Sequence, residues 1–360
     1  MLDARCGRIY SMKPFSFPII GVDISDESFK FLRLEYRSGR RELAFFGVKD
    51  LPKGIVEAGE IIDPTALARA LKDVLRRYRS RFPYLALSLP EEKGFLRVVR
   101  MQRLPVHEIR QALEFQLEEH IPYPPADLVF DFQVIGPVQR KNEMQVVIMA
   151  YPREIIESYM LVSRNAGFLP VIFELESQAV ARAVVPRGSS NAVLVGDIGR
   201  TRTTFSIVYR GAVHFTSTIK VGGKDIDAIL TESLHITESQ ASDVKIGRGF
   251  DYSSEEIIKS LTPALGVLKD EAVRQINYWE HRIQGEEPTI SRITICGGDA
   301  HLKGLPEYLA RELNLPVERA RIWENLFDVN QYVPPMNAHL TMRYGTVFGL
   351  ALRGDEDLFS

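Results

Sequence analysis

Short apolar runs that end in an aspartate mark two places in the chain. The first is FPIIGVDIS, which reaches Asp23, and the second is AVLVGDIG, which reaches Asp197. Each is followed by a turn of small or polar residues and by another apolar run, FKFLRLE or TTFSIVY, so each predicts two strands joined by a tight turn. We therefore predict two related halves of similar length, with Asp23 and Asp197 in equivalent places.

Helical periodicity fills much of the sequence between these strands. Asp63 and Pro64 have the residue types of an N-cap and a first helical turn, and apolar residues recur at helical spacing as far as Tyr78. The other face of that helix is cationic, which is typical of a solvated face, although it could also meet anionic lipid: Arg69, Lys72, Arg76, Arg77 and Arg79. Further helices are predicted over 105–122, 153–165, 254–281 and the final segment YGTVFGLALR.

A small α+β unit interrupts the first half. The strands YLALSLPEEK, FLRVVRM, DLVFDFQVIG and MQVVIMAYP accompany the helices 105–122 and 153–165, and the loop PRGSSN follows as the strongest turn signal of the middle region. We predict five parts: a lead-in of residues 1–14, a first lobe of 15–83 and 166–190, an inserted subdomain of 84–165, a second lobe of 191–221 and 290–360, and a helical subdomain of 222–289.

Composition limits the class of protein. The 360 residues carry 45 cations and 47 acids, a net charge of −2 that gives no overall attraction to nucleic acid. Cys6 and Cys296 have neither the spacing of a disulfide framework nor that of a zinc site. No apolar stretch is long enough to cross a bilayer, and residues 1–14 lack the apolar core of a secretory signal. The sequence predicts a soluble cytoplasmic protein of two to three domains.

Three motifs could hold a nucleotide. The turns after Asp23 and Asp197 can present backbone N–H groups to a phosphate, and an aspartate at a strand end can hold Mg²⁺ through its water shell. The third motif, Gly297-Gly298-Asp299, would let a flat base lie against the backbone. Each motif alone is also an ordinary hairpin or tight connection, so the prediction depends on their order along the chain.

In that order the motifs resemble the actin-like ATPase superfamily and, more closely, the PilM family of type IV pilus assembly proteins. The likeness runs from about Phe17 to Arg353 and includes GVDISDESFKFLRLE, LALSLPEEKGFLRVVRM, HEIRQALEFQLEEHIPYP, VGDIGRTRTTFSIV, KVGGKDID and CGGDAHLKGLPEYLARELNLPVE. FtsA-like proteins carry an insert in the same place but usually end in a membrane-binding helix, whereas RGDEDLFS is short and acidic. The resemblance implies an α/β, actin-like (ribonuclease H-like, duplicated) fold. Its two lobes would each hold a five-stranded mixed sheet, with an inserted α+β subdomain on the first lobe.

The resemblance also implies ATP with Mg²⁺ in the cleft between the lobes. Asp23 and Asp197 match the family's two metal-facing aspartates. The positions that match its nucleotide contacts are Ser25, Asp26, Ser28 and Lys30 in the first turn, Gly199, Thr201 and Thr203 in the second, Gly222 and Gly223 at a helix entry, Lys245 in a helix near the ribose or base, and Gly297 and Gly298 at the base. No catalytic residue is assigned.

The chain departs from the family pattern at several of these places. Ser25, Asp26 and Glu27 stand where the family has glycine and serines, Ser242 replaces a glutamate, and Asp299 replaces a small residue. Carboxylates aimed at a triphosphate add like charge, which costs around 1 kcal/mol per close pair in water and more in a drier cleft. These departures favour weaker nucleotide binding and at most slow hydrolysis.

By resemblance, the protein is a scaffold of the inner-membrane assembly platform of a type IV pilus or a related secretion system, at the inner face of the cytoplasmic membrane. It would bind the cytoplasmic N-terminal tail of a PilN-like bitopic protein in a groove between the first lobe and the insert, with an open sheet edge or apolar surface supplied by the strands around 85–89 and 95–99. ATP would act as a conformational clamp. Self-association is a further expectation, and membrane contact is expected only through partners. Two alternatives remain open: an adaptor without nucleotide, and an ATP-dependent kinase of the same fold.

Overall fold

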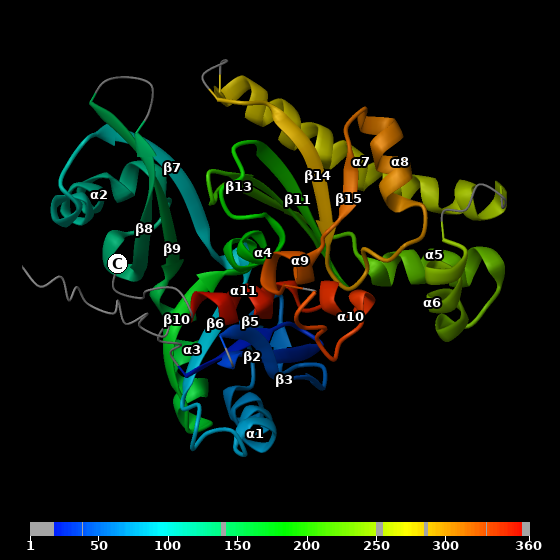
Figure 1. Ribbon diagram of the computed structural model, residues 1–360, viewed down its shortest axis with the longest axis horizontal. Helices are drawn as coiled ribbons and strands as arrows, with labels where there is room; N and C mark the ends of the chain where they lie inside the picture. Colours follow the sequence, from blue (N-terminus) through cyan, green and yellow to red (C-terminus); the bar gives the residue numbers. More distant parts are fainter. Residues whose placement is uncertain are drawn as a thin grey trace, which may run out of the picture.

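The computed structural model in Figure 1 describes residues 18–37, 39–137, 142–249, 255–283, 287–328 and 330–354. The predicted lead-in of residues 1–14 and most of the acidic end RGDEDLFS lie outside these residues. Two five-stranded mixed sheets form the two lobes. The first has the order β10 (Leu169–Leu175), β6 (Tyr84–Leu89), β1 (Ile19–Ile24), β2 (Ser28–Arg37) and β3 (Arg40–Asp50). The second has the order β15 (Val317–Arg319), β14 (Ile290–Cys296), β11 (Ala192–Ile198), β12 (Thr203–Tyr209) and β13 (Ala212–Ile219).

The two sheets repeat one topology. In each, the central strand pairs antiparallel with the next strand along the chain and parallel with a strand that comes much later: β1 with β2 and β6, and β11 with β12 and β14. Asp23 is opposite Lys30 near the end of β1, and Asp197 is opposite Thr204 near the end of β11. The predicted duplication, with the two aspartates in equivalent positions, is confirmed.

The insert is a three-stranded antiparallel sheet covered by one helix. Its strands are β7 (Phe95–Gln102), β9 (Glu143–Pro152) and β8 (Leu128–Pro137), and its helix is α2 (Val106–His120), which buries Ile109, Leu113 and Leu117. The short helices η1 (Glu91–Lys93) and η2 (Pro125–Asp127) precede β7 and β8. The strand 84–89, which the sequence analysis placed in the insert, instead lies inside the first sheet between β1 and β10. Its near-continuous burial is that of a central strand covered on both faces.

The remaining helices cover the sheets. Helix α1 (Pro64–Leu75) begins as predicted, because the Asp63 carboxylate accepts from the Ala66 N–H at 2.9 Å. It packs against α3 (Arg153–Asn165), near the small hairpin β4 (Val56–Glu57) and β5 (Glu60–Ile61). The second lobe carries α5 (Gly223–Leu234), α6 (Glu238–Gly247), α7 (Glu255–Ile283) and α8 (Leu305–Leu313). Helices α9 (Ile322–Leu326) and α10 (Ala338–Met342) follow β15.

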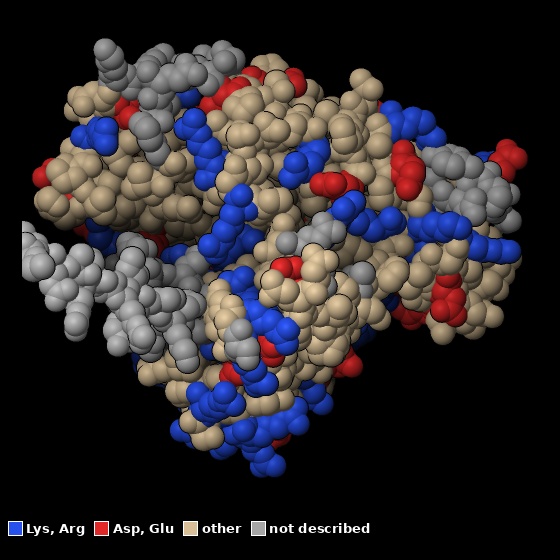
Figure 2. Space-filling model, viewed as in Figure 1, with Lys and Arg blue, Asp and Glu red and all other residues tan. Residues whose placement is uncertain are grey.

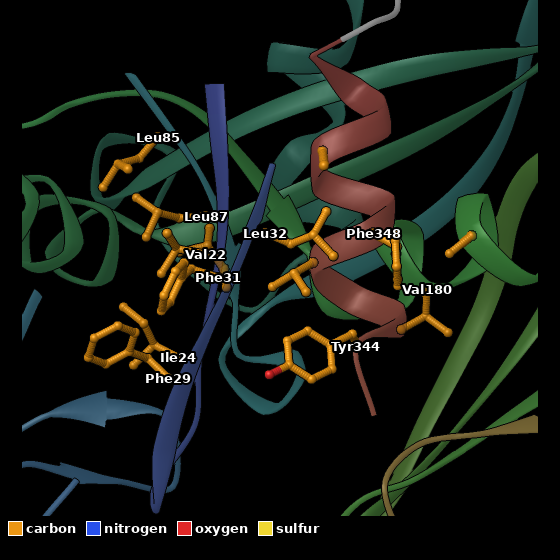
Figure 3. Close-up of a cluster of buried hydrophobic side chains, with 14 of the residues drawn as sticks. Val22, Ile24, Phe29, Phe31, Leu32, Leu85, Leu87, Val180, Tyr344 and Phe348 are labelled. Carbon is orange, nitrogen blue, oxygen red and sulfur yellow. The ribbon is translucent and has the colours of Figure 1, made fainter. Parts of the chain in front are cut away.

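Two helices, α4 and α11, cross the boundary between the lobes. The last helix, α11 (Gly345–Arg353), packs on β1, β2 and β6 of the first sheet, although the sequence analysis assigned residues 290–360 to the second lobe. Helix α4 (Glu176–Val184), which was assigned to the first lobe, packs against both α11 and β13. Figure 3 shows Phe348 and Tyr344 of this region beside Val180 of α4, with Leu32 of β2 next to them. The two crossing helices therefore join the lobes through one shared apolar core.

Candidate functional site

A cavity of about 720 Å³ lies between the two lobes, at the ends of β1 and β11. Both predicted metal-facing aspartates, Asp23 and Asp197, line it. The predicted nucleotide contacts that also line it are Ser25, Asp26, Ser28, Lys30, Gly199, Thr201, Lys245, Gly297 and Gly298. The topology therefore brings most of these residues to one place, while their role in holding a nucleotide stays a prediction.

Three of the predicted contacts do not line the cavity. Thr203 is fully buried and its hydroxyl donates to the Val221 carbonyl at 2.7 Å, while its strand neighbour Thr204 faces the cavity instead. Gly222 packs against the backbone of the turn 199–202, where a Cβ would come within 2.7 Å of three backbone atoms. At Gly223 a Cβ would overlap the Asp299 carboxyl group, so that side chain covers the helix entry.

The first turn is closed by its own serines. The Ser25 hydroxyl and N–H both donate to the Ser28 carbonyl, at 2.8 Å and 2.9 Å. Asp23 is held on both oxygens, because Lys30 donates to one at 3.2 Å and the buried Ser88 hydroxyl to the other at 2.8 Å. Sequence reasoning missed Ser88, since it comes from β6, 65 residues further along the chain.

An arginine of the second turn bridges the two lobes. Arg202 pairs with Asp26 of the first turn at 3.0 Å and also with Glu92 of η1. Asp26 additionally accepts from the Gly59 N–H at 3.0 Å. Arg202, a cation of the opposite lobe, therefore offsets the negative charge of Asp26 that was expected to repel a phosphate. Sequence reasoning missed Arg202, although it lies inside the motif that was singled out.

A second set of ion pairs fixes the helices of the second lobe. Lys245 is 4% exposed, and its ammonium contacts the carboxylates of Asp227 at 2.8 Å and Asp299 at 2.5 Å. Arg200 pairs with Asp227 and with Glu238. Lys245, predicted near the ribose or base, is thus already engaged by two buried carboxylates.

Burial changes the protonation of two carboxyl groups at the cavity. Desolvation, together with the negative charge of Asp23, raises the pKa of Asp197 to about 6, against the opposing effects of Lys30 and a hydrogen bond from the Cys296 thiol. Desolvation and then Asp23 also raise the pKa of Glu176, the first residue of α4, well above its usual value. Sequence analysis missed Glu176, because it begins a helix outside the three motifs that predicted the site.

The residues present fit a Mg²⁺-bound nucleotide only in part. Asp23 and Asp197 could hold a hydrated Mg²⁺, and no group of three or more His, Cys, Asp or Glu side chains within the described residues forms a closed metal site. In the second turn, the N–H groups of Arg200 and Thr201 have no acceptor among the described residues and could donate to a phosphate. The lining, however, carries nine acidic side chains, two of them with the raised pKa described above, against five cations, four of which already pair with carboxylates. A polyanion must therefore enter with its own cation or displace these pairs.

A second, larger concavity of about 940 Å³ lies between the insert and the first lobe. Strand β8 of the insert lines one side and β10 of the first sheet lines the other. Each is the last strand of its sheet within the described chain, so two sheet edges face the same groove. On β8, two carbonyls already accept from side chains: Phe130 from Arg110 at 3.1 Å and Leu128 from Arg153 at 3.2 Å. Its wall is mostly apolar and includes Val129, Phe132, Val134, Val171, Phe173 and Met149. We call this concavity the β8–β10 groove.

Comparison with known proteins places these features in a family. The sequence profile of the family described as "Type IV pilus assembly protein PilM" matches residues 21–355. A solved "PilM-PilN type IV pilus biogenesis complex" contains a chain that is 24% identical, with a TM-score of 0.76, covering 95% of this chain and 99% of that one.

More distant structures share the fold. MreB5 of Spiroplasma citri, solved bound to ADP, is 16% identical with a TM-score of 0.52, covering 93% of this chain and 95% of that one. The ethanolamine utilization protein EutJ from Carboxydothermus hydrogenoformans is 17% identical with a TM-score of 0.51, covering 92% and 88%. The actin-like, two-lobed α/β fold predicted from the motifs is confirmed. Among the described residues, no helix is long and apolar enough to span a bilayer.

Proposed function

The chain belongs to the PilM family of type IV pilus assembly proteins, and on that premise we propose that it binds an extended cytoplasmic segment of a PilN-like membrane protein in the β8–β10 groove. The observation that carries the proposal is the pair of terminal sheet strands, β8 and β10, that line this groove. An extended segment can add to such an edge through its main-chain N–H and C=O groups, while its alternate side chains enter the apolar wall.

The groove has the chemistry of peptide capture. Val129, Val134 and Val171 are between 36% and 40% exposed, so an extended segment in the groove could bury them. At the rim, Glu174 is held by Arg182, which also donates to the Gly349 carbonyl at 3.1 Å. This ion pair ties the β10 wall to α4 and α11, so the groove is connected to the helices that join the lobes.

The strands proposed for this role from the sequence were 85–89 and 95–99. The first is β6, which has β1 and β10 on its two sides and therefore offers no open edge. The second lies in β7, an edge strand of the insert that is next to β13 of the second lobe. The groove itself is lined by the edges of β8 and β10.

A titration with the tail peptide of a PilN-like protein tests the proposal. Val171→Asp places a charge on the apolar wall at β10, and we expect it to weaken binding by at least about tenfold, because the carboxylate would have to be desolvated by the peptide. Val48→Asp is the matched control, since Val48 is 41% exposed and lies on β3, at the opposite edge of the same sheet. Equal affinity of both variants for the peptide would contradict the proposal.

For the cleft, we propose that it holds a Mg²⁺-bound adenine nucleotide that acts on the orientation of the lobes. Support comes from the two facing aspartates, the unpaired N–H groups of the second turn and the exposed Arg343 beside Gly298. When bound, the nucleotide would supply the negative charge of its phosphates, which could replace the carboxylates of Asp26 and Glu92 as partners of Arg202. The adaptor without nucleotide remains the second candidate, favoured by the ion pairs that already engage the cations of the cleft.

Thermal unfolding with and without Mg·ATP separates the two candidates. A ligand at 100 times its dissociation constant stabilises the folded state by about 2.7 kcal/mol, which raises the melting temperature by several degrees. Asp197→Ala, which removes one of the two facing carboxylates, should reduce that rise. No rise at millimolar Mg·ATP would favour the adaptor and leave the peptide proposal standing.

A further inference from the structure

One end of the first lobe collects cations. Figure 2 shows Lys and Arg gathered over α1 at the bottom of the view, although the whole chain has a net charge of −2. In the chain from α1 to the start of β6, the only carboxylate is Asp73. We call the exposed cations of this segment the cationic face: Arg69, Lys72, Arg76, Arg77, Arg79 and Arg81.

Packing, more than ion pairing, positions several of these arginines. Arg77 lies over the ring of Tyr78 at 4.7 Å, and Arg81 lies over the ring of Phe82 at 5.2 Å. The guanidinium of Arg79 rests on the backbone at Gly167, where a Cβ would be 3.0 Å from it. Tyr78 is itself stacked on Phe45, with ring centroids 3.8 Å apart. Packing therefore holds the side chains of Arg77, Arg79 and Arg81 against the surface of the lobe.

Their charge is largely uncompensated. Arg81 pairs with Glu35 at 3.1 Å, and Glu35 is shared with Arg37 of β2. For Arg69, Lys72 and Arg76, no carboxylate lies within 4 Å in the part of the chain that the structure describes. Like charges held close together repel, so the arrangement destabilises the free protein slightly and favours an anionic surface as ligand.

We propose that the cationic face docks onto the headgroups of anionic phospholipids. The face is formed by an outer helix, α1, and the turn that follows it, and it lies outside both cavities described above, so it suits an extended plane of phosphates more than a single small anion. The choice of lipid rests on the proposed function, in which a membrane-embedded partner holds the chain beside a bilayer. This contact goes beyond the expectation that the membrane is met only through partners.

The contact is electrostatic and peripheral. The outward residues of α1 are polar or charged, so this face brings no apolar anchor into the acyl region. Basic residues near an anionic leaflet each strengthen binding by about fivefold, and the attraction falls off within a Debye length, about 8 Å at physiological ionic strength. Binding is therefore reversible and sensitive to salt.

Sedimentation with vesicles tests the proposal on the full chain without any partner. We expect binding to vesicles that contain phosphatidylglycerol and none to phosphatidylcholine alone. The triple variant Arg69→Gln, Lys72→Gln and Arg76→Gln should lower the affinity about a hundredfold, at about fivefold per cation. The matched control, Lys220→Gln, Arg248→Gln and Lys259→Gln, removes three exposed cations of the second lobe and should bind like the unmodified protein.

Three results would overturn the proposal: no preference for phosphatidylglycerol, an equal loss in both triple variants, or a duplex DNA that binds this face more tightly than the vesicles do. Retained helicity in circular dichroism shows that the variants fold. The tail-peptide titration, run on the same variants, keeps the two proposals separate. Peptide binding should survive the α1 triple variant, and vesicle binding should survive Val171→Asp.

Discussion

Burial at the cleft changes the ionisation of single residues, and Asp197 gives a pH-dependent consequence. Its pKa is about 6 in the folded chain, raised first by desolvation and then by Asp23, against an ordinary value of 3.8. Well below pH 4, Asp197 is protonated in both the folded and the unfolded chain, so it does not change the free energy of unfolding. As the pH rises from about 4 to 6, the unfolded chain ionises first, and folded stability is lost over that window.

Asp197→Asn should therefore stabilise the protein at neutral pH and leave it unchanged in acid. Because Asp197 is partly exposed to the cavity, we expect a gain of about 1 to 2 kcal/mol, less than the full pKa difference would give. Denaturant unfolding of both proteins from about pH 4 to pH 7 measures it. Two curves that stay parallel across this range would show that Asp197 ionises normally.

The buried Lys245 gives a second prediction at this scale. Lys245→Ala leaves the carboxylates of Asp227 and Asp299 buried without their cation, so we expect a loss of about 3 to 5 kcal/mol in unfolding free energy. Lys220→Ala, at an exposed position, should change it by less than about 0.5 kcal/mol. A small effect at Lys245 would mean that water, and not the ion pair, satisfies the two acids.

Residue types could be predicted at the cleft, but their partners could not. Asp23 and Asp197 were identifiable because a strand end is a local feature of the sequence. The engagement of Lys245 needs α5, α6 and the turn after β14 to meet, which no local pattern encodes. Thr203 and Thr204 differ only by the alternation of a strand, and one residue of register decided which of them faces the cavity.

At the scale of elements, two glycines in helix interiors should respond in opposite ways to alanine. In α11, a Cβ on Gly349 would lie 1.8 Å from the Ala179 carbonyl oxygen of α4, so Gly349→Ala must push the two joining helices apart. We expect a loss of more than about 3 kcal/mol. In α7, Gly266 has nothing within 4 Å, and Gly266→Ala should stabilise by about 0.5 to 1 kcal/mol. Calorimetry of both variants checks the pair, and a neutral Gly349→Ala would contradict the close crossing of α4 and α11.

Helices and strands themselves were largely predictable, since periodicity and caps are local. Helix α1 has the predicted Asp63 cap, and the long helix predicted over 254–281 is found as α7, with Ser254 outside the described residues. The lobe to which each helix or strand belongs was harder to predict. An apolar strand such as β6 has the same sequence pattern whether it belongs to the insert or to the first sheet. Helix α11 follows the second lobe in the sequence but packs on the first sheet. Only tertiary packing separates these possibilities.

For the whole molecule, the duplication was predictable because each half carries the same strand, turn and strand pattern around its aspartate. The pattern could not predict which side chains form the contacts between the two halves. One of these side chains is Arg202, which reaches Asp26 and Glu92 across the cleft.

Removal of this bridge should loosen the two lobes. We expect Arg202→Ala to increase the radius of gyration in small-angle X-ray scattering, because the cleft then loses the ion pairs that join its two sides, while the crossing helices and the β7–β13 contact remain. Arg200→Ala is the control, since Arg200 makes a comparable set of ion pairs entirely within the second lobe. If the two variants scatter alike, the bridge does not set the orientation of the lobes.

The proposed role as a partner-binding scaffold depends most on the β8–β10 groove, and hydrogen exchange with the tail peptide tests it directly. On peptide addition, amides of β8 and β10 should exchange at least about tenfold more slowly, because edge N–H groups gain a main-chain acceptor. Strand β3, at the far edge of the same sheet, should not change. Protection that falls on β3 or the second lobe, with β8 and β10 unaffected, would contradict the account.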